Sequence, residues 1–281
     1  MPQYKVKYST RNTYAEQVKE GVYELNVCPC TDDSQLLKSY TVKHSLAEQP
    51  FVYKNIFGFE IMRVRSVSPF NEFNFDFEAL VQKENSKPVT SSDLSADEEN
   101  EIINSKEFYI DHHLFVTPSH YTRIDESQIR DAPSLSKGMR VFDFLMEVNA
   151  YVNRLLSYHK NITNVYTSAG EAISLGKGVC QDYAHVFIAI ARHNKVPCRY
   201  VSGYINQSKH FVGDSFMHAW VEAFVPGSGW IGLDPTNLML ADDNFIKVSH
   251  GVDYADCTPI KGVLHTNGQQ KTSARVSVSQ Q

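Results

Sequence analysis

The sequence predicts an α+β fold, in which an all-β region precedes a region of helices and further strands. Residues 4 to about 85 alternate apolar and polar side chains, and this period of two is typical of half-buried antiparallel strands. From Val141 onward the apolar residues recur at steps of three and four, as in an amphipathic helix. A length of 281 residues favours two domains over one.

The first region, residues 1–85, is predicted to be an all-β N-terminal domain. Turn-forming residues such as Pro29, Gly58 and Pro69 separate its strand-like runs. The runs themselves are residues 4–8, 22–27, 39–44, 59–64 and 73–78.

Residues 86–139 are interpreted as an acidic linker followed by connecting strands. The segment begins with a polar, acidic stretch that is poor in aromatic residues. Within this stretch, Ser95 and Glu98 have the spacing of a capping box, which also fits the start of a short helix. The apolar triplets 108–110 and 114–116 are predicted to be strands.

Residues 140–281 are predicted to form a second domain of helices and strands. After the amphipathic helix comes a short helix that Gly176 closes. A third helix starts at Cys180 and runs to about Asn194, because Pro197 blocks a longer one. The strand-like segments are residues 198–204, 218–225, 230–234 and 273–279.

Composition and charge exclude several classes of function. A net charge of −5 and a pI of about 6.1 argue against a protein that binds nucleic acid through a basic surface. No apolar run reaches the ~18 residues that a membrane span needs. The first residues lack the apolar core of a signal peptide. We therefore expect a cytoplasmic protein that binds neither nucleic acid nor membranes.

The cysteines do not form a disulfide framework, because there are five and their spacing fits no small scaffold. Cys28 and Cys30 flank a proline, but no second cysteine pair or histidine cluster accompanies them. We interpret them as structural thiols and expect no metal site.

Cys180 differs from the other cysteines because it opens a predicted helix. Backbone N–H groups at a helix start are unpaired and the helix dipole is positive there, so a thiolate is favoured over a thiol. A thiolate in such a place is a candidate nucleophile. The alternative is a buried structural thiol, which is a common role of free cysteine.

A predicted hairpin supplies a base and its partner. His218 starts one strand and Asp234 ends the next, with a turn near Gly227 between them. The two side chains would lie almost opposite each other, within contact distance if they share a face. His218 is then the general base and Asp234 fixes its tautomer. The alternatives are a packed histidine and, because Pro235 follows, a turn-forming aspartate.

Three sequence blocks resemble the bacterial transglutaminase-like superfamily, whose members are described as cysteine proteases. The blocks are residues 178–185, 218–222 and 230–237. The resemblance covers residues 140–281 strongly, and the preceding β region is similar to the domain found ahead of this core. It implies a papain-like core in which the nucleophile helix packs on an antiparallel sheet, so residues 140–281 would be its catalytic core.

The same resemblance assigns the roles of nucleophile, base and orienting group to Cys180, His218 and Asp234. It implies a peptide or protein substrate and no organic cofactor. Calcium is not expected, because no acidic loop has the spacing of calcium ligands. Val252 stands where many relatives have an arginine, so we expect a difference in substrate specificity.

The acyl-transfer chemistry requires donors to an oxyanion. The backbone N–H of Cys180 is the first candidate. Papain-like enzymes use a glutamine a few residues before the nucleophile, but Ser174 holds that place here. Gln181 is a candidate for the second donor, with a structural or substrate-side role as the alternative. His185 is interpreted as a packed histidine, because its spacing turns it away from Cys180.

These residues predict a cysteine protease or amidase that acts on peptide or glutamine-like amides through a Cys180 thioester. With an amine in place of water as acceptor, the same residues would make a transglutaminase. A non-catalytic binding or scaffold module that retains the fold is an alternative of a different class. Deglycosylation of the peptide-N-glycanase type shares the triad, but no feature of the chain supports a glycan site.

Overall fold

The computed structural model describes residues 1–84 and 92–281. Residues 1–84 form strands without a helix, as the period of two predicts. Along the two longest of these strands most alternate residues are buried, as Phe73, Phe75 and Phe77 are. The strands are β1 (Gln3–Val18), β2 (Gly21–Leu25), β3 (Gln35–His44), β4 (Phe51–Lys54), β5 (Glu60–Ser66) and β6 (Phe70–Lys83).

The rest of the described chain alternates helices and strands. The helices are α1 (Ala96–Asn104), α2 (Lys106–Val116), α3 (Val141–Leu155), α4 (Ala169–Leu175), α5 (Cys180–His193) and α6 (Tyr254–Cys257). The strands are β7 (Ser157–Tyr158), β8 (Lys177–Gly178), β9 (Cys198–Ile205), β10 (His218–Val225), β11 (Gly229–Asp234), β12 (Met239–Leu240), β13 (Phe245–Gly251), β14 (Ile260–Leu264) and β15 (Gln270–Gln280).

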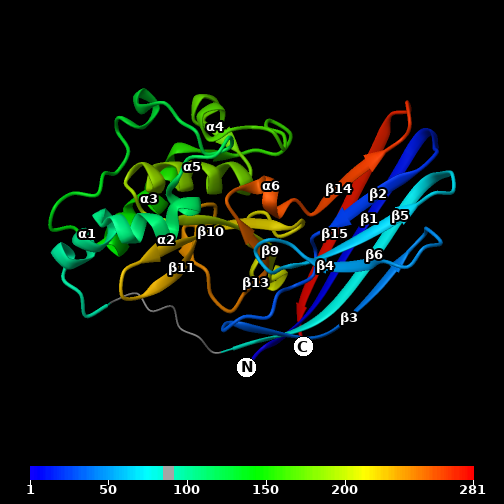
Figure 1. Ribbon diagram of the computed structural model, residues 1–281, viewed down its shortest axis with the longest axis horizontal. Helices are drawn as coiled ribbons and strands as arrows, with labels where there is room; N and C mark the ends of the chain where they lie inside the picture. Colours follow the sequence, from blue (N-terminus) through cyan, green and yellow to red (C-terminus); the bar gives the residue numbers. More distant parts are fainter. Residues whose placement is uncertain (85–91) are drawn as a thin grey trace.

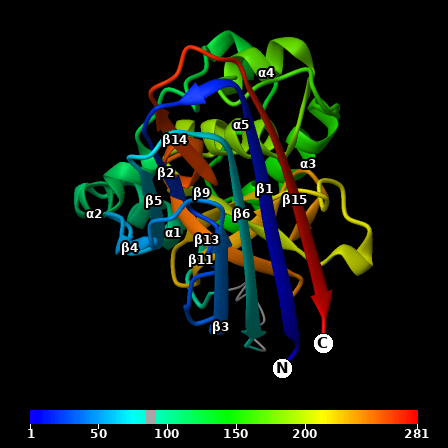
Figure 2. The same ribbon diagram turned by 90° about the vertical axis from the view of Figure 1, so that its right-hand side faces the viewer.

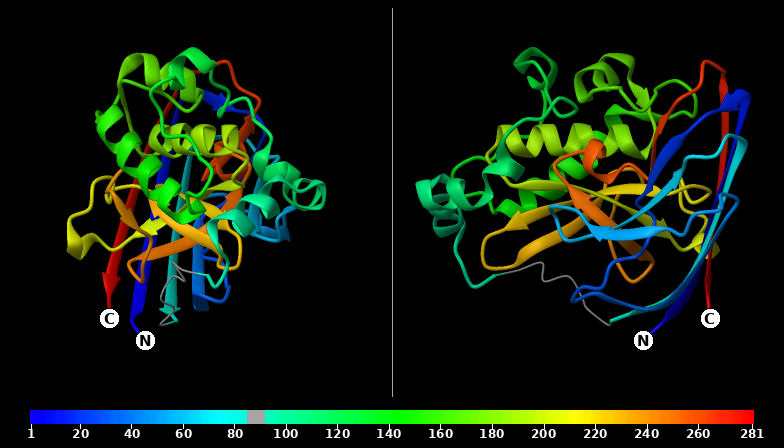
Figure 3. Two further views of the ribbon diagram at one scale, coloured as in Figure 1. Left: turned by 90° about the vertical axis from the view of Figure 1, so that its left-hand side faces the viewer. Right: turned by 45° about the vertical axis from the view of Figure 1, so that its right-hand side comes forward.

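The core is a helix, α5, that starts at Cys180 and packs on an antiparallel sheet, as the sequence predicts. The sheet has the strand order β12-β11-β10-β9-β13, and α5 packs against β10 and β9. Helices α3 and α4 flank α5, and Figure 3 shows all three on the same side of the sheet. The α5 side chains are almost entirely buried, because sheet and helices enclose them. The predicted helix ends at Gly176, in a left-handed conformation, and at Asn194 are confirmed.

The two last strands do not belong to the core sheet. In the β-rich half, one sheet has the order β15-β1-β6-β3 and the other the order β14-β2-β5-β4. Strand β15 pairs with β1 from Tyr4↔Gln280 to Tyr14↔Gln270, and Figure 2 shows the two running side by side. The range 140–281, predicted to be one domain, therefore needs correction, since its last strands complete the N-terminal sheets.

The segment between the two halves is helical, which corrects the prediction of a linker with connecting strands for 86–139. Residues 85–91 lie outside the described residues. The capping box at Ser95 is present and begins α1. The triplets predicted as strands belong to α2, where Phe108 and His112 stack one turn apart at 4.2 Å. Two short apolar runs without a clear period read equally well as strands or as one helical face.

Figure 1 shows the β-rich half beside the half that contains the helices, and buried polar contacts join the two. The side-chain amide of Gln35 donates to the Lys247 carbonyl at 2.7 Å and accepts from the Lys247 N–H at 2.8 Å. The Tyr204 hydroxyl donates to the Val27 carbonyl at 2.7 Å. Gln35 and Tyr204 are fully buried, so these bonds fix the core sheet against the N-terminal strands.

Candidate active site

The start of α5 holds Cys180 in a fixed turn. Cys180 is the first helical residue and is partly exposed. The Asp182 carboxylate caps the helix, since it accepts from the Val179 N–H and from the Thr163 hydroxyl, each at 2.7 Å. A Cβ at Gly178 would lie 2.6 Å from the Asp182 Cβ. Residue 178 must therefore be glycine for this cap to form.

His218 and Asp234 lie side by side, and both side chains are fully buried. The Nε2–H of His218 donates to Oδ2 of Asp234 at 2.8 Å. The hairpin register pairs Val221 with Leu233, so the two residues are diagonal neighbours instead of almost opposite ones. The offset is two residues, and an even offset keeps both side chains on the same face.

The loop after β11 completes the hydrogen bonds of Asp234. Its Oδ1 accepts from the backbone N–H groups of Thr236 (2.9 Å) and Asn237 (3.3 Å), and its Oδ2 accepts from the Asn237 side-chain amide (2.7 Å). Burial alone would raise the pKa of Asp234, but the charge of His218 and these hydrogen bonds hold it below its usual range. Asp234 is therefore an ionised partner for an imidazolium.

The pairing with Asp234 favours the protonated, positively charged form of His218. Burial acts to lower the pKa of His218, but the Asp234 carboxylate and the Cys180 sulfur outweigh it and raise the pKa to about 10. The Nδ1 atom is buried and has no hydrogen-bond partner among residues 1–84 and 92–281. One ring nitrogen of His218 thus bonds to Asp234, and the other has no partner among these residues.

A glycine loop packs against this free nitrogen. Gly213 has a φ of +89°, and a Cβ there would lie only 2.9 Å from Nδ1 of His218. Asn237 holds the loop to the site, because its Oδ1 accepts from the Val212 N–H at 2.9 Å while its amide reaches Asp234. Neither Gly213 nor Asn237 is predicted as a site residue from the sequence. Asn237 stands three residues after Asp234, within the sequence block 230–237. An asparagine at this distance from an aspartate is typical of a turn, and this spacing could have predicted its place at the site.

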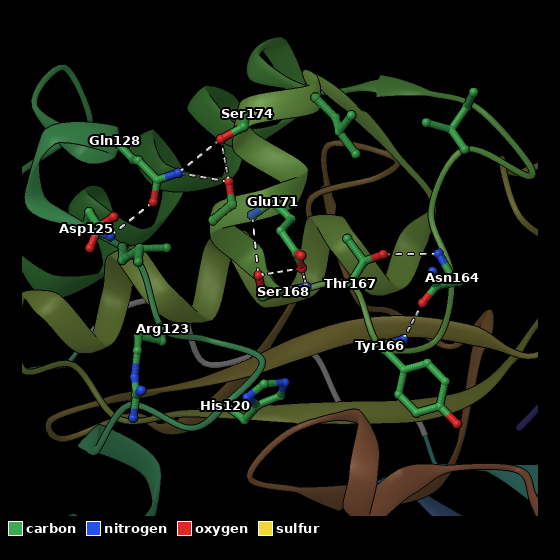
Figure 4. Close-up of a pocket in the computed structure, with 14 residues that line it drawn as sticks. His120, Arg123, Asp125, Gln128, Asn164, Tyr166, Thr167, Ser168, Glu171 and Ser174 are labelled. Carbon is green, nitrogen blue, oxygen red and sulfur yellow. Dashed lines mark hydrogen bonds between the residues drawn. The ribbon is translucent and has the colours of Figure 1, made fainter.

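The side chains of Gln181, the candidate oxyanion donor, and of Ser174 both donate to backbone carbonyls. The Gln181 amide donates to the Val165 carbonyl at 3.4 Å, so its role at the oxyanion stays a prediction. The Ser174 hydroxyl donates to the Gly170 carbonyl at 2.9 Å and accepts from Gln128 at 3.2 Å (Figure 4).

Figure 4 shows the groove that these residues line, with a volume of about 850 Å³. It runs between the segments 120–128 and 162–175, and it contains neither Cys180 nor His218 nor Asp234. The groove is therefore separate from these three side chains, although Gln181 connects one of its walls to the start of α5.

His185 is a packed histidine, as its spacing predicts. Its ring stacks on Tyr121 at 5.1 Å and packs at the same distance against Tyr200, and its Nε2 accepts from the Tyr254 N–H at 3.2 Å. Burial lowers the pKa of His185 to about 3, so the ring is neutral.

The other thiols are poor nucleophiles. Burial raises the pKa of Cys30, Cys198 and Cys257 to about 12 in each case, and it raises that of Cys28 further. Within the described ranges, no group of three His, Cys, Asp or Glu side chains could hold a metal ion. In the same ranges, no helix is long and apolar enough to cross a membrane.

Comparison with known families matches residues 132–235 to the transglutaminase-like superfamily. This part of the chain is similar to that superfamily. The match includes Cys180, His218 and Asp234. The resemblance described for the three sequence blocks is thereby confirmed.

Mycobacterial proteins are among the relatives of the chain. The uncharacterized protein Rv2569c of Mycobacterium tuberculosis is 33% identical over 147 residues, which are 49% of this chain and 47% of that protein. The chain thus spans about half the length of this relative. The uncharacterized protein ML0607 of Mycobacterium leprae is 24% identical over 98% of both chains.

A solved structure shares the whole fold. It is described as a "Putative Cysteine Protease" from Cytophaga hutchinsonii, and it superimposes with a TM-score of 0.77. The match covers 99% of this chain and 90% of that chain at 21% sequence identity. The β-rich half and the transglutaminase-like core therefore recur together in another protein.

Proposed function

We propose that the protein is a cysteine hydrolase that cleaves peptide or glutamine-like amides through a thioester at Cys180. The Cys180 thiolate attacks the carbonyl carbon, and His218 protonates the departing amine. His218 then takes a proton from water, which attacks the thioester, releases the acid and restores the thiolate. Asp234 holds the imidazole and stabilises its charged form.

The 2.8 Å bond between His218 Nε2 and Asp234 Oδ2 carries this proposal. It leaves Nδ1 as the reactive nitrogen, and the charge of the Cys180 sulfur acts on the same ring. A histidine that served only packing would not need an ionised aspartate with hydrogen bonds to each oxygen. The match of residues 132–235 to the transglutaminase-like superfamily supports the same chemistry.

Water is the proposed acceptor of the acyl group, and an amine is the alternative. The His218 side chain is fully buried, and the Gly213 loop lies against the nitrogen that must activate the acceptor. The amine-transfer alternative predicts that an added primary amine diverts the thioester.

Burst kinetics with p-nitrophenyl acetate test the proposal. We expect a burst of p-nitrophenolate equal to the enzyme concentration, which Cys180→Ala abolishes and His218→Gln slows by several orders of magnitude. Cys30→Ala is the matched control, because Cys30 is the other partly exposed cysteine. A burst of equal size in the Cys180→Ala protein would remove Cys180 as the nucleophile. Product diverted to an added amine would favour the transferase.

A further inference from the structure

We propose that Tyr158 is the second oxyanion donor of the active site, through its phenolic O–H. This inference rests on the proposed thioester chemistry and names a residue that the sequence analysis did not select. The first donor of that chemistry, the Cys180 N–H, offers the oxyanion a single hydrogen bond. Oxyanion holes usually supply more than one donor, from backbone N–H groups or side chains, so a second donor is expected near the start of α5.

Backbone pairing places Tyr158 beside this helix start. Strands β7 and β8 are parallel neighbours, with Tyr158 opposite Gly178. The His159 N–H donates to the Gly178 carbonyl at 2.9 Å, which fixes the register two residues before Cys180. The position of the tyrosine backbone is thus set by the same turn that positions the nucleophile.

The hydroxyl of Tyr158 lies close to the reactive nitrogen of His218. The Cβ position built on Gly213 is 2.9 Å from His218 Nδ1 and 3.6 Å from the Tyr158 hydroxyl. A single point is thus in contact distance of both groups. The Cys180 sulfur also acts on both, since its charge, after burial, raises the pKa of Tyr158 above its usual range. The phenol therefore stays protonated and can donate.

The Tyr158 O–H is available for a ligand. Its side chain is only partly buried, and its hydroxyl makes no hydrogen bond within residues 1–84 and 92–281. The neighbouring Tyr183 differs, because its hydroxyl donates to the Leu156 carbonyl at 2.7 Å. The rings of the two tyrosines pack against each other at 6.5 Å. Packing can thus hold the Tyr158 ring while its hydroxyl is left free to donate.

The chemistry gives the hydroxyl a defined task. As the sulfur–carbon bond forms, the π electrons of the carbonyl move to its oxygen. The Cys180 N–H and the Tyr158 O–H then donate to this oxyanion. When the tetrahedral intermediate collapses, the carbon–oxygen double bond returns and the amine leaves with a proton from His218. Tyr158 keeps its proton throughout and acts only by donation.

Two reagents separate this role from a general effect on the thiolate. Acylation by p-nitrophenyl acetate passes through an oxyanion, whereas alkylation by iodoacetamide displaces iodide without one. We expect Tyr158→Phe to slow acylation of Cys180 by about 10²-fold, in the range found for loss of one oxyanion donor. The alkylation rate should stay within about twofold of the wild type, because thiolate formation does not use the phenol.

Tyr183→Phe is the matched control. It removes a hydroxyl from the neighbouring ring, and this hydroxyl already donates to the Leu156 carbonyl. It should leave both rates unchanged. Tyr158→His restores an N–H at the site and should recover part of the acylation rate. Wild-type acylation in Tyr158→Phe, or parallel loss of acylation and alkylation, would overturn the assignment. Absence of Cys180 acylation in the wild type would instead contradict the proposed function itself.

Discussion

At the scale of single residues, the site depends on a pair of buried, charged side chains. His218 and Asp234 are both fully buried, and each compensates the burial of the other. Removing one partner of such a pair leaves a buried charge without compensation, which costs several kcal/mol. The pair therefore stabilises the imidazolium that a thiolate needs, and it does so without solvent.

Asp234→Asn should move the pH dependence of the reaction. The Asp234 carboxylate raises the pKa of His218 to about 10, so the imidazolium is present below that pH and is lost as the pH rises through it. Without the carboxylate, burial dominates, and the alkaline limb of the acylation rate should move to lower pH by more than one unit. The measurement is the pH profile of p-nitrophenolate release. Asp33→Asn, on the exposed surface, is the control, and an unshifted alkaline limb would refute the pairing.

At the scale of elements, the cap of α5 matters more than the helix composition. Asp182 connects the Val179 N–H to the Thr163 hydroxyl, so one carboxylate ties the helix start to the preceding loop. In α4 the equivalent residue, Glu171, is exposed and bonds only within its own capping box. The buried cap thus positions the nucleophile, whereas the exposed one serves its local turn.

Asp182→Ala should lower the free energy of unfolding by about 1–2 kcal/mol, the usual range for loss of a helix cap. It should also change the rate at which iodoacetamide alkylates Cys180, because the turn that holds the sulfur loses its anchor. Urea unfolding and alkylation kinetics check both effects. Glu171→Ala is the matched control and should leave the alkylation rate unchanged. Equal effects of the two substitutions would show that Asp182 has no special role.

The elements that sequence reasoning predicts well are those with a strong local signal. The start of α5 at Cys180 follows a glycine turn, and α4 ends at Gly176, where a left-handed residue is needed. Helix α2 was predicted as strands because its apolar triplets contain aromatic residues that suit either structure. Tyr158 and Gly213 came to the site through long-range packing, which no local pattern encodes.

At the scale of the whole molecule, the chain ends are part of the first sheet. Strand β15 pairs along most of β1, and the Gln207 amide reaches from the core to the β15 carbonyl of Val276 at 3.1 Å. Gln207 also donates to the Asp214 carbonyl at 2.8 Å, next to Gly213. The C-terminal strand therefore supports the loop that packs against the reactive histidine.

A chain that ends at His265 should lose cooperative folding, since β1 would expose an unpaired edge and Val278 would leave the core. A chain that ends at Ser279 keeps almost the whole pairing and is the control. Thermal melting and solubility are the measurements. A shortened chain that melts like the full one would show that β15 is dispensable, and the domain boundary near residue 140 would then stand.

Stability should fall on both sides of neutral pH. Burial lowers the pKa of His185 to about 3, so the unfolded chain takes up a proton below pH ~6.5 that the folded one does not, and stability drops as the pH falls towards 3. The raised pKa of His218 acts in the opposite direction. Its contribution is present below pH ~6.5 and is lost as the pH rises towards 10.

Urea unfolding at a series of pH values measures how the free energy of unfolding falls on each side of neutral pH. His185→Gln keeps an acceptor for the Tyr254 N–H but cannot titrate, so its acid limb should be less steep by up to ~1.4 kcal/mol per pH unit. Its alkaline limb should match the wild type. An acid limb as steep as that of the wild type would mean that His185 takes no part in acid unfolding.

The central claim is that Cys180 carries the acyl group, and residue-level mass spectrometry tests it most directly. The protein would be incubated with a pooled cell lysate, quenched in acid and digested, and the acyl adduct mapped. The account predicts an adduct on Cys180 that hydroxylamine removes, as expected of a thioester, and that is missing from the Cys180→Ala protein. Identical adducts on the wild-type and Cys180→Ala proteins, or none on Cys180, would contradict it.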